Sequence, residues 1–160
     1  MPYIRKALLS DAQAIHDIRN AAICAGSSGY YSPDLIARWT EGDLATAGFC
    51  EAVRNSFYVA ELGGQVVGTG AIDIASGKLD AIFVSPSHMK TGLGRTMLQF
   101  LEQLAIANGI ASLHLESTLN AERFYTRNGF SRVRNAKYES PRGFSLDCIV
   151  MKKVLQNARP

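Results

Sequence analysis

Apolar residues near the start of this chain recur at helical spacing. Ile15, Ile18 and Ala22 follow one another at intervals of three and four residues, which places them on one face of a helix. The spacing of Ser10 and Gln13 is that of a capping box, in which a serine side chain begins a helix. We therefore expect an amphipathic helix that starts at Ser10.

A second helix and a run of strands follow. Ser32 as the N-cap, with Pro33 at the first helical position, predicts a helix start, and helical pieces continue to about residue 55. Aromatic and β-branched residues then cluster between glycine turns, which is typical of antiparallel strands. The strands predicted in this way cover residues 57–62, 65–74 and 78–84, after a short first strand over residues 3–7.

The C-terminal half alternates between helices and strands. A helix preceded and followed by a strand normally places those two strands in parallel. The predicted elements are a helix over residues 94–107, a strand over 110–116, a short helix over 120–129, and closing strands over 131–138 and 144–153. We expect an α/β (α+β) fold with a mixed, mostly antiparallel central sheet, helices on both faces, and a single domain over residues 1–160.

The composition is that of an ordinary globular protein, with 47% hydrophobic residues, 19% charged residues and a net charge of +3. This charge is too small to indicate a nucleic-acid or membrane partner, although it suits a polyanionic ligand. The three cysteines, Cys24, Cys50 and Cys148, have the spacing of neither a disulfide framework nor a metal site, so we expect no metal. The sequence contains neither the apolar stretch of a signal peptide nor one long enough to span a membrane, so we expect a cytoplasmic protein.

A glycine loop joins the predicted strand 78–84 to the helix that follows it. Gly92 and Gly94 lie where the helix begins, and glycines let backbone N–H groups approach a ligand closely. The first N–H groups of a helix are unpaired and favour an anion, most often a phosphate. Lys90 and Arg95 can add positive charge at the rim.

Two common phosphate-binding motifs do not fit this loop. A P-loop would need a glycine at the position of Met89, and a dinucleotide-binding fingerprint would need one at the position of Met97. A plain strand-to-helix turn and a nucleotide-phosphate site of another kind stay open.

A second motif lies about thirty residues further along. We expect Asn120 to cap a short helix that carries Phe124 and Tyr125 and ends at Gly129, which Phe130 follows. Together with the glycine loop, these residues resemble the two central motifs of the GNAT superfamily, the acyl-CoA-dependent N-acyltransferases.

The resemblance implies an enzyme that uses acetyl-CoA, or another acyl-CoA, as donor and a primary amine as acceptor. Met89 departs from the family pattern, which has Gln or Arg there, and this removes one side-chain contact but leaves the backbone donors. A non-catalytic acyl-CoA-binding or sensing module is the alternative, and a homodimer stays open. The residues that the resemblance places at the coenzyme are Ile82, Phe83, Val84, Met89, Lys90, Thr91, Gly92, Leu93, Gly94, Arg95, Thr96, Asn120, Phe124 and Tyr125.

Acylation of an amine sets three chemical requirements. The amine must lose a proton, for which Glu116 and Asp80 are equal candidates as base and ordered water is a third. The thioester oxygen needs an N–H donor, expected near Phe83 or Val84. The departing thiolate needs a proton, and the resemblance gives this role to Tyr125.

The acceptor should bind between the N-terminal helices and the closing strands. In a regular strand over residues 78–84, Asp80 would share a face with Ile82. Small amines, antibiotics, amino acids and proteins all stay open as acceptors. The expected walls of the acceptor site are Tyr30, Tyr31, Trp39 and Tyr138.

Overall fold

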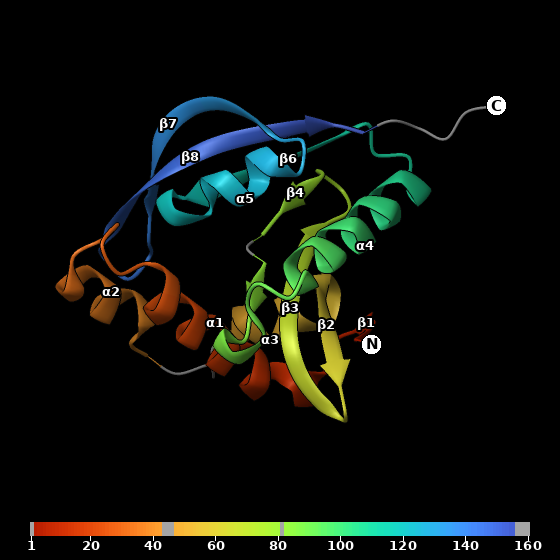
Figure 1. Cartoon of the computed structure of the whole chain (residues 1–160), viewed down its shortest axis with the longest axis horizontal. Helices are drawn as coiled ribbons and strands as arrows, with labels where there is room; N and C mark the ends of the chain where they lie inside the picture. The colour runs from red at the N-terminus through yellow and green to blue at the C-terminus, as the bar shows by residue number, and fades with distance from the viewer. Residues whose placement is uncertain (1, 43–46, 81, 156–160) are drawn as a thin grey trace.

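The computed structural model describes residues 2–42, 47–80 and 82–155 and confirms the predicted mixed architecture. The strands are β1 (Tyr3–Lys6), β2 (Phe57–Leu62), β3 (Gln65–Asp73), β4 (Lys78–Leu79), β5 (Phe83–Val84), β6 (Ser112–Thr118), β7 (Ser131–Glu139) and β8 (Ser145–Val154). Within the described residues they form one sheet of eight strands, in the order β1-β2-β3-β4-β6-β8-β7, with β5 paired to β3. The pairing of β4 with β6 is parallel, as predicted, and the other pairings are antiparallel. Figure 1 shows β7 and β8 as a long curved hairpin at one end of the sheet.

The helices cover both faces of the sheet, as expected. They are α1 (Ala12–Gly26), α2 (Pro33–Thr40), α3 (Ala47–Ser56), α4 (Leu93–Ala107) and α5 (Glu122–Arg127), with 3-10 turns η1 (Leu9–Asp11), η2 (Pro86–His88) and η3 (Leu119–Ala121). Val59 and Ala60 are neighbours in β2 and point to opposite faces. Val59 packs with residues of α1 and α3, whereas Ala60 belongs to the core under α4 and α5. The predicted helical stretch includes residues 43–46 and the predicted strand includes residue 81, and these residues lie outside the described part of the chain.

The start of α1 differs from the sequence prediction. The helix begins at Ala12 after the turn η1, so Ser10 is not its cap. The neighbouring carboxylate of Asp11 accepts the Leu8 N–H at 2.7 Å and both terminal nitrogens of Arg5 at 2.8 and 3.0 Å. This charged contact with β1 decides where the chain turns. The second predicted cap is confirmed, because Ser32 accepts a hydrogen bond from the N–H of Leu35.

The predicted continuous strand over residues 78–84 is wrong, because a bulge divides it into β4 and β5. Leu79 lies opposite Ile72 and Phe83 lies opposite Thr69, so a step of four residues here matches a step of three in β3. One extra residue in a strand bends it and resets the alternation of its side chains. Asp80 therefore shares its cavity-facing side with Phe83, not with Ile82.

The bulge also separates two strands that would otherwise run together. β4 pairs with β6 through Lys78 and His114, whereas β5 pairs with β3 on one edge and has no partner toward β6 among the described residues. Strand β6 starts two residues later than predicted and pairs with β8 over its whole length. The sheet consequently opens between β5 and β6.

The Arg5–Asp11 contact gives a prediction for stability. Arg5 also donates to Glu61 at 3.0 Å, so one guanidinium ties β1, η1 and β2 together. We expect Asp11→Ala to lower the free energy of unfolding by about 2 kcal/mol at neutral pH, since hydrogen bonds to charged groups contribute about 1.5–3 kcal/mol. Urea unfolding measures this loss, and the matched control is Asp17→Ala, which removes an exposed carboxylate bonded to Gln13.

The loss should depend on pH. Hydrogen bonding from Arg5 holds the pKa of Asp11 below its ordinary value. The stabilisation is therefore present above that ordinary value and disappears as the pH falls through the folded-state pKa. A difference between wild type and variant that stays constant into acid would contradict this account.

Candidate active site

The loop between β5 and α4 has the shape that the sequence predicts. Gly92 is the N-cap of α4 and has a φ of 89°, in the left-handed region that favours glycine. Nothing lies within 4 Å of a Cβ built on Gly92, so the backbone angle and not space requires glycine here. Lys90 also has a positive φ, of 63°, which turns the loop back toward the helix.

The backbone at this helix start is rich in unpaired donors. In the part of the chain that the structure describes, the N–H groups of residues 90–95 donate no hydrogen bond. Lys90 and Arg95 are exposed and form no ion pair with any described residue. Leu93 and Met97 are buried in the core beneath α4, so Leu93 can offer a ligand only its backbone. Such a cluster of N–H groups with flanking cations is suited to a di- or triphosphate group.

The two sequence motifs pack directly against each other. A Cβ built on Gly94 would lie 3.3 Å from the ring of Phe124 and 3.8 Å from Val84. The absence of a side chain at this glycine therefore lets the start of α4 approach both α5 and β5. The donor-rich loop and the tyrosine-bearing helix are thereby held in one arrangement.

Tyr125 lies in the core beside the bulge. Its side chain is 5% exposed, and its ring packs against Phe124 at 5.1 Å and Phe130 at 5.5 Å between centroids. Burial raises the pKa of Tyr125 to about 12, and a hydrogen bond from the main chain of Ile82 acts in the opposite direction. The phenol consequently keeps its proton at neutral pH and can donate it or share it in a hydrogen bond.

Asn120 does not cap α5, contrary to the sequence prediction. The chain enters through the 3-10 turn η3, and Ala121 holds the N-cap position without a side-chain bond. Asn120 is thus one position too early to reach the first N–H groups of the helix. Its Oδ1 is buried and has no hydrogen-bond partner among the described residues, which is unusual for a side-chain oxygen.

A cavity of about 670 Å³ lies between the N-terminal helices, the bulged segment and the β7–β8 hairpin. Three of the predicted walls, Tyr31, Trp39 and Tyr138, line it. Tyr30 does not, because its side chain points to solvent and is 56% exposed. The Tyr31 hydroxyl donates to the Asp147 carbonyl at 2.6 Å and accepts the Leu119 N–H at 3.0 Å, which fixes this wall.

Both candidate bases line the same cavity. Glu116 accepts a hydrogen bond from the Lys78 Nζ at 3.3 Å, so it is held in an ion pair. Asp80 forms no ion pair with a described residue, and partial desolvation raises its pKa even though it stays open to the cavity mouth. The structure thus brings both carboxylates to the cavity that the aromatic walls enclose.

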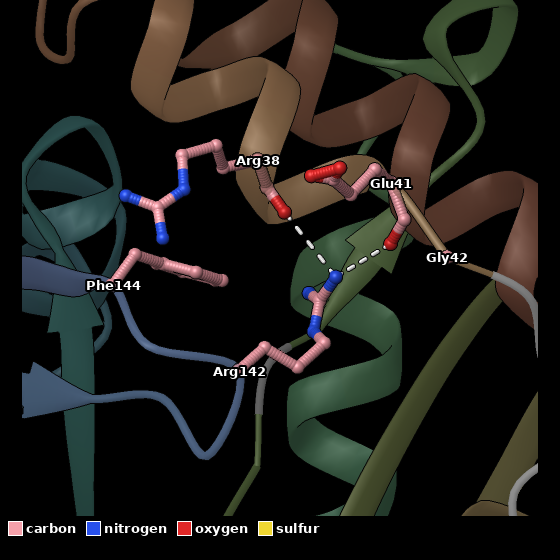
Figure 2. A pocket seen from close by; sticks show the side chains of 5 residues that line it. All are labelled: Arg38, Glu41, Gly42, Arg142 and Phe144. Atoms are coloured by element: carbon pink, nitrogen blue, oxygen red, sulfur yellow. Dashed lines mark hydrogen bonds between the residues drawn. The ribbon is translucent and has the colours of Figure 1, made fainter.

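Sequence reasoning missed two arginines of this cavity, Arg19 and Arg142. Arg19 lies on the polar side of a helical pattern and Arg142 in a hairpin turn, so neither stands in a motif. Arg142 donates to the carbonyls of Arg38, Trp39 and Glu41 at 3.2, 2.8 and 2.6 Å, and so binds the end of α2. Figure 2 shows this contact in an adjoining pocket of about 310 Å³ lined by Arg38, Glu41, Gly42, Arg142 and Phe144.

Two kinds of feature are absent from the described part of the chain. It contains no group of three or more His, Cys, Asp or Glu side chains arranged to hold a metal ion. None of its helices is both long and apolar enough to cross a membrane.

Comparison with known proteins agrees with this geometry. The family model of the acetyltransferase (GNAT) domain matches residues 53–132. An uncharacterized N-acetyltransferase of Methanocaldococcus jannaschii is 32% identical over 163 residues, which cover 98% of this chain and 94% of that protein.

Solved structures show the same fold. A GCN5-related N-acetyltransferase from Rhodopseudomonas palustris superposes with a TM-score of 0.90 at 25% identity, over 97% of this chain and 96% of its own. The PaiA N-acetyltransferase of Thermoplasma acidophilum, in complex with coenzyme A, gives a TM-score of 0.76 at 17% identity, over 96% and 99% of the two chains. The resemblance of the two motifs is thus confirmed, and this chain belongs to the GNAT acetyltransferase family and is an acyltransferase.

Proposed function

We propose that this enzyme transfers an acetyl group from acetyl-CoA to the primary amine of an acceptor bound in the large cavity. One observation carries the proposal: three successive residues of the bulged segment reach three parts of the site. Ile82 bonds to Tyr125, Phe83 lines the cavity, and Val84 packs beside Gly94 at the start of α4. Donor, acceptor and proton donor would therefore meet at one short stretch of backbone.

The residues present fit the coenzyme. The unpaired N–H groups of residues 90–95 suit its pyrophosphate, with Lys90 and Arg95 at the rim. The unpaired Oδ1 of Asn120 is a buried acceptor that an amide N–H of the coenzyme could satisfy. Met89 adds no polar contact, so binding of the phosphates would rest on the backbone. The proposed contact set is that of residues 82–84 and 89–96 with Asn120, Phe124 and Tyr125, in a single domain over residues 1–160.

The proposed chemistry needs two proton movements and one N–H donor. Bound acetyl-CoA supplies the thioester, whose C–S bond breaks as the C–N bond to the amine forms. Strand β5 is unpaired toward β6 among the described residues, so an N–H near Phe83 or Val84 is available for the thioester oxygen. Tyr125 offers its phenolic proton to the departing sulfur, and Asp80 takes the proton of the amine directly or through water.

Asp80 is preferred over Glu116 for a physical reason. Its raised pKa makes it a better proton acceptor than an ordinary aspartate, and no described residue neutralises it in an ion pair. Glu116 already accepts a hydrogen bond from Lys78 in an ion pair, so its carboxylate is engaged before a substrate binds. Glu116 then serves to position Lys78 at the cavity wall.

The first experiment tests donor binding and transfer. The wild-type protein should release CoA from acetyl-CoA only when an amine is added, measured with a thiol reagent. Gly92→Ala should raise the KM for acetyl-CoA several-fold, because an alanine strained at φ 89° would displace the N–H groups of α4.

The matched control is Gly109→Ala. Gly109 has a φ of 77° and equally open surroundings, but it lies beyond the opposite end of α4. The Gly109→Ala substitution should lower the free energy of unfolding by a similar amount and leave the KM for acetyl-CoA unchanged. Equal effects of the two substitutions on KM would contradict the proposed phosphate site.

The second experiment concerns Tyr125. Tyr125→Phe keeps the ring packing and removes the proton donor, so kcat should fall roughly 100-fold, within the range of general acid catalysis. The KM for acetyl-CoA should stay within about twofold. Steady-state kinetics measure both, and Tyr58→Phe, a substitution of a tyrosine packed on Phe100, is the control. Unchanged turnover in Tyr125→Phe would remove this residue from the mechanism.

The third experiment concerns Asp80. A base must be ionised, so kcat/KM for the acceptor should rise with pH through the pKa of Asp80, which lies above its ordinary value. Asp80→Asn should lower this kcat/KM at least tenfold and abolish that limb of the profile. Glu116→Gln is the matched control and should keep the limb. Loss of the limb in Glu116→Gln alone would make Glu116 the base, and its persistence in both variants would leave the role to water.

The Asp80→Asn substitution can also be tested through thermal stability. Because the folded-state pKa of Asp80 is raised, its charged form opposes folding, and stability is lost as the pH rises through that pKa. In acid, the Asp80→Asn variant should therefore have a Tm equal to or above that of the wild type. Toward neutral pH, the Tm of the variant should rise relative to that of the wild type. A fall in Tm at neutral pH would show that Asp80 is structural.

A further inference from the structure

Arg19 is a half-buried cation without a carboxylate partner. It projects from α1 into the wall of the large cavity, where one terminal nitrogen donates to Asn20 Oδ1 at 2.6 Å. The other terminal nitrogen makes a long contact of 3.4 Å to the Trp39 carbonyl. No acidic side chain among the described residues forms an ion pair with Arg19. Burial lowers its pKa, and the charge of Arg142 lowers it further.

Arg142 approaches the same point from the hairpin between β7 and β8. Its Nη2 donates to the Trp39 carbonyl at 2.8 Å, so the two guanidinium groups converge on one main-chain oxygen. Like charges brought together in this way repel each other, and a carbonyl dipole offsets this only in part. An anion bound beside both guanidinium groups would offset this repulsion.

The carboxylates of the cavity do not supply that anion. Figure 2 shows the Glu41 side chain directed away from Arg142, which donates a hydrogen bond to the main-chain oxygen of Glu41 instead. Asp147 forms an ion pair with Lys137 at 2.6 Å. Asp80 and Glu116 lie beside Lys78, where they form the acidic group of the site.

The rest of the cavity wall is largely aromatic. Trp39 packs edge-on against Tyr31 at 5.6 Å between ring centroids, and both line the cavity. Phe49, Phe57 and Phe144 belong to the same lining. The cavity thus combines a cationic pair, an acidic group and apolar surface in one lining, which matches a ligand with an anionic group, an amine and an apolar body.

We propose that Arg19 and Arg142 bind the carboxylate of the acceptor, so that the acceptor is an apolar or aromatic amino acid whose amine faces the bulged segment. This inference rests on the proposed function and narrows its acceptor class. A carboxylate accepts paired hydrogen bonds from guanidinium groups and removes the repulsion between the two arginines. Arg142 already binds the end of α2, so Arg19 is the residue whose loss affects the ligand most selectively.

The first test compares acceptors with and without the carboxylate. L-phenylalanine, L-leucine and L-methionine are offered beside phenethylamine, 3-methylbutylamine and 3-methylthiopropylamine, with CoA release as the readout. The wild type should use the amino acids with a kcat/KM at least tenfold higher. Arg19→Gln should raise the KM for the amino acids tenfold or more and leave the KM for the simple amines within twofold. Arg19→Lys should restore part of the affinity for the amino acids.

The matched control is Arg38→Gln. Arg38 packs over Phe144 as Arg142 does and lines the adjoining pocket, but it is not part of the large cavity. This variant should keep the preference for amino acids. Equal use of both classes by the wild type, or equal effects of the two substitutions on amino-acid KM, would overturn the inference while leaving acetyl transfer to amines intact.

A second measurement does not depend on turnover. Calorimetry in the presence of CoA compares binding of N-acetyl-L-phenylalanine with that of N-acetylphenethylamine, and thermal unfolding checks that each variant is folded. The wild type and Arg38→Gln should bind the carboxylate-bearing compound at least tenfold more tightly, and Arg19→Gln should not. Equal binding of the two compounds by the wild type overturns the inference, whereas a lack of CoA release with every amine would count against the proposed function alone.

Discussion

The one-residue bulge between β4 and β5 is the constraint on which the rest of the site depends. A regular strand would continue beside β6, and its side chains would alternate without interruption between the two faces. The extra residue breaks that alternation, so Ile82 bonds to the buried phenol while Phe83 joins Asp80 at the cavity. It also releases β5 from β6, which opens the sheet where donor and acceptor would meet. Each later feature of the site is placed relative to this opening.

Backbone geometry, more than side-chain chemistry, shapes the donor side. Gly92 sets the direction of the loop, and the contact of Gly94 with Phe124 holds the start of α4 against α5. The N–H groups of residues 90–95 stay unpaired within the described part of the chain whatever the side chain at position 89, so under the proposed binding mode Met89 removes one polar side chain but leaves the backbone donors. Burial then separates the roles of the titratable groups, since it keeps Tyr125 protonated and makes Asp80 easier to protonate.

Charge in the large cavity is divided between two groups of residues. Asp80 and Glu116 lie with Lys78 near the bulge, while Arg19 and Arg142 meet at the end of α2. Aromatic side chains complete the lining of this cavity and lower the local dielectric, which strengthens the electrostatic contacts that a ligand makes there. Under the proposed binding mode, the charged groups would orient the acceptor and the aromatic side chains would hold its apolar body.

Local chemistry accounts for the features that could be read from the sequence alone. The cap at Ser32, the strand over residues 57–62 and the glycine loop at Gly92 depend on residues within one turn of each other, and the structure has each of them where it was expected. The remaining features depend on contacts between distant segments. The bulge exists only against the register of β3, and α1 begins at Ala12, beside a contact of Asp11 with Arg5 of β1 that the local pattern does not contain. Asn120 is a local exception, because the chain enters α5 through the turn η3 and the N-cap is Ala121. Arg19 and Arg142 come together where a helix and a hairpin turn converge on one carbonyl. Such contacts leave no periodicity or motif in the chain, because their energy comes from surfaces that only folding brings together.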